Sequence, residues 1–129
     1  MIYLDSSAIV KLARQEAETD ALRGWLAANP QPLAASALAR TEASRALMRS
    51  EPAALPVLRS VIAVFHQRPI TDAILDAAAS LPGAGLRSLD AIHLATVEDL
   101  RPVLSWFVAY DKRLVDAARS RGLPVASPS

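Results

Sequence analysis

The chain opens with IYLDSSAIVKLAR (residues 2–14), a short apolar run that leads directly into a candidate helix. The same order, a short apolar run followed by a longer helical pattern, recurs along the chain. This alternation is typical of strands joined by helical crossovers. It predicts an α/β fold built on a parallel sheet.

Strands are expected at the apolar runs, and helices where capping residues and helical spacing lie between them. The expected strands are Ile2–Leu4, Pro32–Ala35, Pro69–Ile70, Val103–Val108 and Leu123–Ala126, which makes a sheet of four to five strands. The expected helices are Ser6–Arg14, Glu18–Ala28, one capped by Ser36 that runs to Arg49, Glu51–Gln67, one capped by Thr71 that ends near Leu81, one capped by Ser88 that ends before Pro102, and one from Asp111 to Gly122. The composition of Pro82–Gly85 predicts a plain loop.

Length and composition limit the class of protein. At 129 residues the chain is expected to form one domain, residues 1–129. It has no cysteine, which excludes disulfides and thiolate zinc sites. The opening residues lack a secretory signal and no apolar run is long enough to cross a bilayer, so we expect a cytoplasmic protein. The net charge of +1 argues against a protein that passively coats RNA, but not against a nuclease with an acidic metal site.

Three acidic residues fall at or soon after expected strand ends, and a fourth begins a helix that leads into a strand. Asp5 follows the first strand and Asp111 the fourth, Glu42 lies in the helix after the second strand, and Asp90 begins the helix that leads into the fourth strand. Open parallel sheets bind ligands beyond the carboxyl ends of their strands. We therefore expect the four carboxylates to meet in one pocket.

Each of these residues also has a structural interpretation. Asp5 and Asp111 can cap helices, a role that is compatible with a second one. Glu42 can belong to a solvated stripe of ion pairs with Arg45, which lies on the same side of its helix. Asp90 is harder to explain in this way, because helical spacing surrounds it with apolar residues, where an unpaired carboxylate is costly.

Carboxylates gathered in one pocket repel each other, so either their pKa values rise or a cation occupies the site. An oxygen-rich set without cysteine suits Mg²⁺ or Mn²⁺, which can activate water and stabilise a phosphate transition state. His93, three residues after Asp90, could complete a metal pair. It shares the apolar stripe of Leu89 and Ile92, however, which favours a hydrogen-bonded histidine in the core.

Four stretches together resemble PIN-domain nucleases. They are the opening at residues 2–8, Thr41-Glu42 within Leu38–Leu47, LRSLDAIHLA at residues 86–95 and AYDKRL at residues 109–114. The third resembles the strongest signature of the VapC-type toxins. The resemblance spans nearly the whole chain in the right order and implies a three-layer α/β/α PIN-like fold with a central parallel sheet.

The resemblance also implies an activity and partners. It implies a Mg²⁺- or Mn²⁺-dependent endoribonuclease that attacks RNA with an activated water and acts as the toxin of a VapBC-like pair. It further implies a homodimer and a small VapB-like antitoxin that wraps the N-terminal helices and plugs the site. The site residues it implies are Asp5, Glu42, Asp90 and Asp111 as the acidic metal-binding set, with Ser6 supporting the metal shell through its hydroxyl. Nearby basic residues are candidate contacts to RNA phosphates, namely Arg87, Arg45, Lys112 and Arg113.

One position departs from the family pattern. Ala109 stands where the family often has Thr or Ser, so a hydroxyl that could orient Asp111 is absent, and Asp116 could take part of its role. Alternatives to the nuclease are a catalytically silent PIN domain that binds RNA or protein, and a phosphoacceptor signalling domain. The last is disfavoured because Arg113 follows Lys112 where such domains need a proline. A DNA substrate is a further alternative, because only the family resemblance points to RNA.

Overall fold

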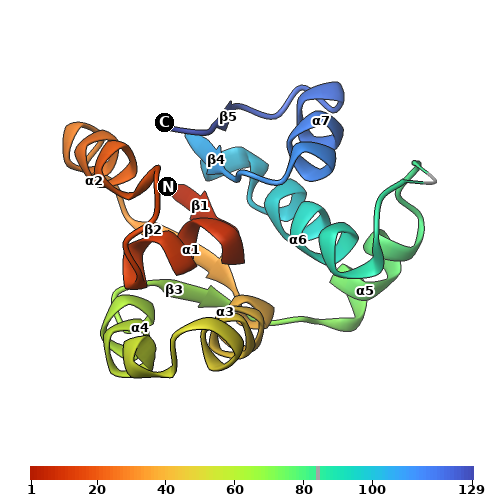
Figure 1. Cartoon of the computed structure of the whole chain (residues 1–129). Helices are drawn as coiled ribbons and strands as arrows, with labels where there is room; N and C mark the ends of the chain where they lie inside the picture. Colours follow the sequence, from red (N-terminus) through yellow and green to blue (C-terminus); the bar gives the residue numbers. More distant parts are fainter. Residues whose placement is uncertain (84) are drawn as a thin grey trace.

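The computed structural model describes residues 1–83 and 85–129, and within them five short strands form one parallel sheet (Figure 1). Their order across the sheet is β3-β2-β1-β4-β5, and every adjacent pair is parallel. The expected α/β class with a parallel sheet is therefore confirmed. The strands are β1 (Ile2–Leu4), β2 (Leu33–Ser36), β3 (His66–Arg68), β4 (Trp106–Val108) and β5 (Val125–Ala126).

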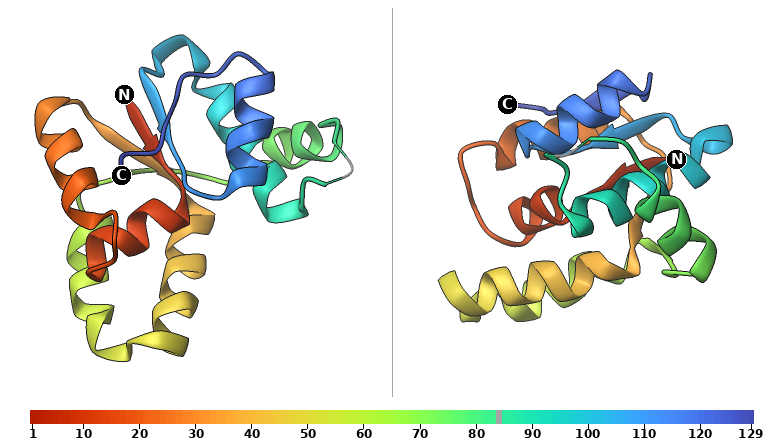
Figure 2. Two further views of the ribbon diagram at one scale, coloured as in Figure 1. Left: turned by 45° about the horizontal axis from the view of Figure 1, so that its top comes forward. Right: turned by 90° about the vertical axis from the view of Figure 1, so that its right-hand side faces the viewer.

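Helices cover both faces of the sheet and give the expected three layers (Figure 2). They are α1 (Ser6–Ala13), α2 (Thr19–Ala28), α3 (Ala37–Ser50), α4 (Leu55–Ile62), α5 (Asp72–Ala79), α6 (Ser88–Asp99) and α7 (Lys112–Ser120), with the 3-10 turns η1 (Pro52–Ala54) and η2 (Arg101–Val103). Helices α1 to α4 contribute to the hydrophobic cluster on one face, and α6 and α7 to the cluster on the other. Helix α5 packs against α6.

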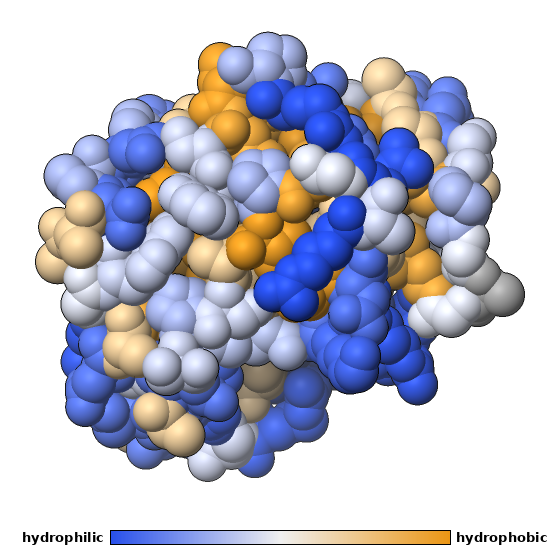
Figure 3. Space-filling view, turned by 90° about the horizontal axis from the view of Figure 1, so that it is seen from above, coloured by the Kyte–Doolittle hydropathy of each residue, from blue (hydrophilic) through white to orange (hydrophobic). Residues whose placement is uncertain are grey.

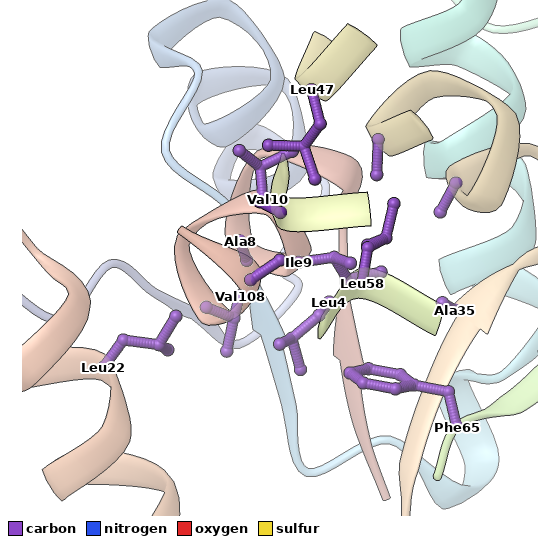
Figure 4. Packing of buried hydrophobic residues seen from close by; sticks show 14 of the residues in the cluster. Leu4, Ala8, Ile9, Val10, Leu22, Ala35, Leu47, Leu58, Phe65 and Val108 are labelled. Atoms are coloured by element: carbon purple, nitrogen blue, oxygen red, sulfur yellow. The ribbon is translucent and has the colours of Figure 1, made fainter. Parts of the chain in front are cut away.

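The two faces of β1 enter two different hydrophobic clusters, because successive side chains of a strand point to opposite sides of a sheet. Leu4 is fully buried in the first cluster, where Ile9 of α1 and Leu58 of α4 lie close to it (Figure 4). Tyr3 is fully buried in the second cluster and packs edge-on against the ring of Phe107 in β4. The central strand is thus fixed from both sides immediately before Asp5.

The third strand and the helix before it differ from the expectation. The segment expected as one helix over residues 51–67 forms η1, the shorter α4 and then the first residues of β3. The strand occupies His66–Arg68 rather than Pro69–Ile70 and pairs with β2 at the edge of the sheet. The side chains of β3 are polar and largely exposed at this edge. The strand therefore lacks the apolar pattern that indicated the other strands.

Other boundaries move by a few residues. The fourth strand begins at Trp106 rather than Val103, because residues 101–103 form η2. Ser88 is the first residue of α6 and does not cap it, since the N-cap position belongs to Arg87. Of the loop expected at 82–85, Ala84 lies outside the described residues.

The connections place β1 at a change of direction in the sheet. From β1 the chain proceeds to β2 and β3 on one side, and then crosses to β4 and β5 on the other. In open α/β sheets, the crevice beyond the strand ends at such a point is the usual ligand site. Asp5 directly follows β1, and Asp111 follows β4, the strand that pairs with β1.

The surface is mixed in polarity. Seen from above, apolar areas are crossed by hydrophilic side chains (Figure 3). Among the helices of the described residues, none combines the length and the apolar character that a membrane span requires.

Candidate active site

Asp5 lies at the N-terminus of α1 with its side chain turned inward. Its Oδ1 accepts hydrogen bonds from the Ala8 backbone N–H at 3.0 Å and from the Ser7 hydroxyl at 2.7 Å. The residue is only 3% exposed. Burial raises the pKa of Asp5 although both hydrogen bonds oppose the rise, and the negative charge of Glu42 adds to it. The expected capping role is therefore present together with an unusual electrostatic environment.

Glu42 projects from α3 toward α6. Its Oε1 lies 2.5 Å from Nε2 of His93, whose side chain is almost fully buried. On its other side, Nδ1 of His93 lies 2.7 Å from the hydroxyl of Tyr3. The expected core histidine is confirmed by its burial, and its hydrogen bonds connect it to one of the candidate carboxylates. The sequence suggested that Glu42 pairs with Arg45 on the same helix. The structure instead pairs Glu42 with His93.

Asp90 lies in the first turn of α6 and has no strong partner for one of its oxygens. Within residues 1–83 and 85–129, Oδ2 is buried and accepts no hydrogen bond, and the Arg87 Nε lies 3.8 Å away. Burial is the main cause that raises the pKa of Asp90, followed by the negative charge of Asp111. Arg87 and His93 oppose the rise, whereas Glu42 adds to it.

Asp111 caps α7, since its Oδ1 accepts a hydrogen bond from the Leu114 backbone N–H at 3.1 Å. The negative charge of Asp111 contributes to the raised pKa of Asp90, and the negative charge of Glu42 contributes to the raised pKa of both Asp5 and Asp90. The four acidic residues from distant parts of the chain are therefore electrostatic neighbours at the carboxyl end of the sheet. Two of the four, Glu42 and Asp90, line a hollow of about 310 Å³ together with Arg87, Ser88 and Leu89.

The donor chemistry of this site suits a hard divalent cation. All four side chains offer carboxylate oxygens, which Mg²⁺ and Mn²⁺ prefer. The unpartnered, buried Oδ2 of Asp90 is an oxygen that a cation would satisfy. Among the described residues, however, no three acidic, histidine or cysteine side chains are gathered closely enough to enclose a metal ion. The carboxylates approach one region without converging on a single point.

Three other candidate residues have different surroundings. The Ser7 hydroxyl donates to Asp5, and the expected role of Ser6 in supporting a metal shell stays a prediction. Asp116 is exposed, and its Oδ2 pairs with Lys112 Nζ at 2.7 Å. Arg113 and Asp116 line a separate hollow of about 380 Å³ beside Gly83.

The basic candidates are all exposed, but only Arg87 lines the acidic hollow. Arg45 is exposed on α3 without lining it. A larger hollow of about 550 Å³ lies between α3 and α4 and contains none of the four carboxylates. The chemistry therefore points to the hollow of about 310 Å³ that Glu42 and Asp90 line.

Sequence reasoning missed Tyr3 and Ser7. Tyr3 stands in an apolar strand, where packing explains an aromatic residue without reference to its hydroxyl. The available signal was chemical: a buried tyrosine hydroxyl needs a hydrogen-bond partner. That partner, His93, is 90 residues away in the sequence, so its identity required the structure.

Comparison with known proteins identifies the family. The family model described as PIN domain matches residues 2–120. Ribonuclease VapC35 of Mycobacterium tuberculosis is 44% identical over 131 residues, covering 99% of this chain and 97% of that protein. Ribonuclease VapC46 of the same species is 45% identical over 128 residues, covering 99% and 98%.

Solved structures share the fold at low sequence identity. Mycobacterium tuberculosis VapC20, described as a sarcin-ricin loop cleaving toxin, superposes with a TM-score of 0.76 at 16% identity, covering 91% of this chain and 95% of that one. A toxin–antitoxin complex from Klebsiella pneumoniae gives 0.76 at 22% identity, covering 100% and 98%. Together with the acidic site and the three-layer sheet, these matches show that the chain belongs to the PIN-domain family and, within it, to the VapC family of ribonuclease toxins.

Proposed function

We propose that this VapC-family protein is a Mg²⁺- or Mn²⁺-dependent endoribonuclease whose acidic site is formed by Asp5, Glu42, Asp90 and Asp111. The observation that carries the proposal is the state of Asp90. Among the described residues, its buried Oδ2 accepts no hydrogen bond and lies next to other negative charges, which is costly to the fold unless something binds it. A perturbed acidic group of this kind in a cleft is a mark of a functional site.

Different residues would have different roles in RNA cleavage. Asp5, Glu42, Asp90 and Asp111 would hold the cation, which supplies Lewis-acid stabilisation of the phosphate and promotes attack by water. Arg87 is exposed at the rim of the hollow and would contact an RNA phosphate. Arg45, Lys112 and Arg113 are exposed and remain candidates for more distant phosphates. Asp116 is engaged by Lys112, so we leave it out of the metal-binding set.

The cellular role that we propose is the toxin of a type II pair in the cytoplasm, neutralised by a VapB-like antitoxin and present as a homodimer. Related folds support this role, because similar structures include a toxin–antitoxin complex and FitAB bound to a DNA fragment. An antitoxin would protect the cell by closing the acidic hollow.

Cleavage is tested with Asp90→Asn, which keeps the size of the side chain and removes its charge. We expect wild type to cleave total RNA with Mn²⁺ and to stop when EDTA is added, and the variant to lose at least about 100-fold in rate. Asp99→Asn is a matched control at the other end of α6, where the carboxylate is exposed and pairs with Arg68. Equal, EDTA-resistant cleavage by wild type and Asp90→Asn would contradict the proposal.

The toxin role is tested in cells. Wild type produced without an antitoxin should slow growth because it degrades RNA, and Asp90→Asn at the same protein level should not. Growth curves with quantified soluble protein provide the measurement. Normal growth at confirmed expression of the wild type would refute the toxin role and leave the nuclease activity to be judged by the RNA assay.

A further inference from the structure

A buried chain of hydrogen bonds leads from the middle of the sheet to Glu42. The backbone N–H of Ser36 donates to the Tyr3 hydroxyl at 3.2 Å, and that hydroxyl lies 2.7 Å from Nδ1 of His93. Nε2 of His93 then lies 2.5 Å from Oε1 of Glu42. Tyr3 is 0% exposed and His93 1% exposed, so water does not compete for these contacts.

The numbers of hydrogen atoms on Tyr3 and His93 indicate which group donates in each of these hydrogen bonds. The oxygen of Tyr3 already accepts from Ser36, and its own single hydrogen is free to be donated to Nδ1 of His93. A histidine nitrogen that accepts carries no hydrogen, so the hydrogen of the neutral ring lies on Nε2. This hydrogen points at Oε1 of Glu42, which accepts it. The opposite arrangement would make Nδ1 and the Ser36 N–H both donate to the Tyr3 oxygen, and the buried hydrogen of Tyr3 would have to turn away from His93 toward the Ser36 side chain.

This series of hydrogen bonds also connects the elements that carry the acidic site. Tyr3 lies in β1 two residues before Asp5, and His93 lies in α6 three residues after Asp90. Glu42 lies in α3 and Ser36 at the end of β2. One set of hydrogen bonds therefore fixes α6 relative to β1, β2 and α3, and with them the spacing of three of the four carboxylates.

We propose that Tyr3 and His93 are positioning residues, which hold the Glu42 carboxylate by one oxygen and keep its other oxygen available to a divalent cation. The proposal rests on the proposed function, since it assigns a purpose to Glu42 within that site. It assigns no chemical step to either residue. A histidine that donates one ring N–H to a carboxylate and receives a hydrogen bond on the other nitrogen is held in a single tautomer.

The direct test is Tyr3→Phe, which removes only the hydroxyl, with Tyr110→Phe as the matched control. The Tyr110 hydroxyl donates a hydrogen bond to the carbonyl of Pro128 at 2.8 Å, a bond that involves none of the four carboxylates. We expect Tyr3→Phe to weaken Mn²⁺ binding to the full chain by about tenfold in calorimetric titration, as loss of an outer partner of a ligand does. Tyr110→Phe should stay within twofold. Equal Mn²⁺ affinity of the two variants and wild type would overturn the proposal.

A second pair of variants separates positioning from packing. His93→Gln can still place an amide N–H near the location of Nε2, whereas the shorter side chain of His93→Asn cannot reach Glu42. We expect Gln to retain more of the Mn²⁺ affinity than Asn, even if both lower the thermal stability of the metal-free protein equally. Affinities that simply follow the loss of stability would mean that His93 is only a packing residue.

The tautomer gives a readout that does not depend on metal. The chain has two histidines, and His66 lies in β3, so the ring nitrogen signals of His93 can be assigned in ¹⁵N spectra by a His66 variant. We expect the metal-free wild type to carry its hydrogen on Nε2 and Tyr3→Phe to lose this preference. A hydrogen on Nδ1 in wild type would overturn the proposed direction of the chain.

The outcomes distinguish this proposal from the function on which it rests. If wild type binds Mn²⁺ and cleaves RNA while Tyr3→Phe behaves as Tyr110→Phe does, only the positioning role is wrong. If wild type neither binds Mn²⁺ nor depends on Asp90 for cleavage, the proposed function is wrong and the positioning role for a cation falls with it.

Discussion

Two acidic residues on the same helix, Asp90 and Glu98, have opposite electrostatic surroundings. The side chains of Asp90 and Glu98 in α6 are both 20% exposed. Glu98 is held by Arg101 at 2.8 Å and by Arg121 at 2.6 Å, and hydrogen bonding to Arg101 is the main cause that lowers its pKa. Asp90 has a buried oxygen that accepts no hydrogen bond in the described part of the chain, with Arg87 at 3.8 Å, and burial together with Asp111 raises its pKa.

The difference shows that the exposed fraction of an acidic side chain does not distinguish a structural role from a functional one. The surroundings of its oxygens do. Glu98 connects α6 to η2 and to the end of α7, and its charge is balanced by arginines. Asp90 has Arg87 only at 3.8 Å, and among the described residues its Oδ2 accepts no hydrogen bond, which costs stability and keeps this oxygen available for a ligand. The following changes test this contrast.

The largest expected effect is on activity. Asp5→Asn removes a charge from the acidic site but keeps the cap of α1, because asparagine caps helices about as well as aspartate. We expect RNA cleavage with Mn²⁺ to fall at least about 100-fold while the circular dichroism spectrum is unchanged. Glu98→Gln should cleave within twofold of wild type. Similar losses in both variants would mean that the contrast between the two regions is wrong.

The second effect is on stability and its pH dependence. Glu98→Gln should lower the free energy of unfolding by about 1 kcal/mol at pH 7, a modest value because the arginines are partly exposed. The pKa of Glu98 is lowered in the folded protein, so its contribution is complete above the ordinary value of 4.5 and is lost as the pH falls through the folded pKa. Urea unfolding should therefore show the two proteins converging at acidic pH. A constant difference would exclude the ion pairs as its cause.

The smallest expected effect has the opposite sign. Without metal, Asp90→Asn should raise the melting temperature by about 2 °C, because it removes a charge that is desolvated and repelled by Asp111. Mn²⁺ should then raise the melting temperature of wild type more than that of the variant. Thermal scans with and without Mn²⁺ measure both. A clearly destabilised Asp90→Asn protein would indicate that Asp90 makes a stabilising contact.

Local sequence signals predicted the parts of the site that depend on neighbouring residues. Asp5 and Asp111 each lie just after a strand and cap the helix that follows, which turn chemistry and apolar runs indicate directly. Asp90 was conspicuous because its helix is apolar on most sides, and α6 is indeed largely buried. The parallel sheet followed from the alternation of strands and helices.

The remaining features depend on contacts between distant residues. The edge strand β3 has polar, exposed side chains, so its place is determined by pairing with β2 rather than by its own pattern. The hydrogen bond between Tyr3 and His93 spans 90 residues, and neither residue has a local signature for it. The hydrogen bond from Ser7 to Asp5 depends on the geometry of the first turn of α1, which the sequence does not specify.

The pairing of β1 with β4 has a consequence for the synthesis of the protein. The strand that precedes Asp5 is made well before its neighbour on one side, residues 106–108, because most of the other elements lie between them in the sequence. Asp111 comes later still. A nascent chain that ends before β4 lacks both the strand and the fourth carboxylate, and so it cannot carry the complete acidic site. If the proposed nuclease activity is correct, the toxin is harmless to the messenger RNA that encodes it until β4 and Asp111 have left the ribosome.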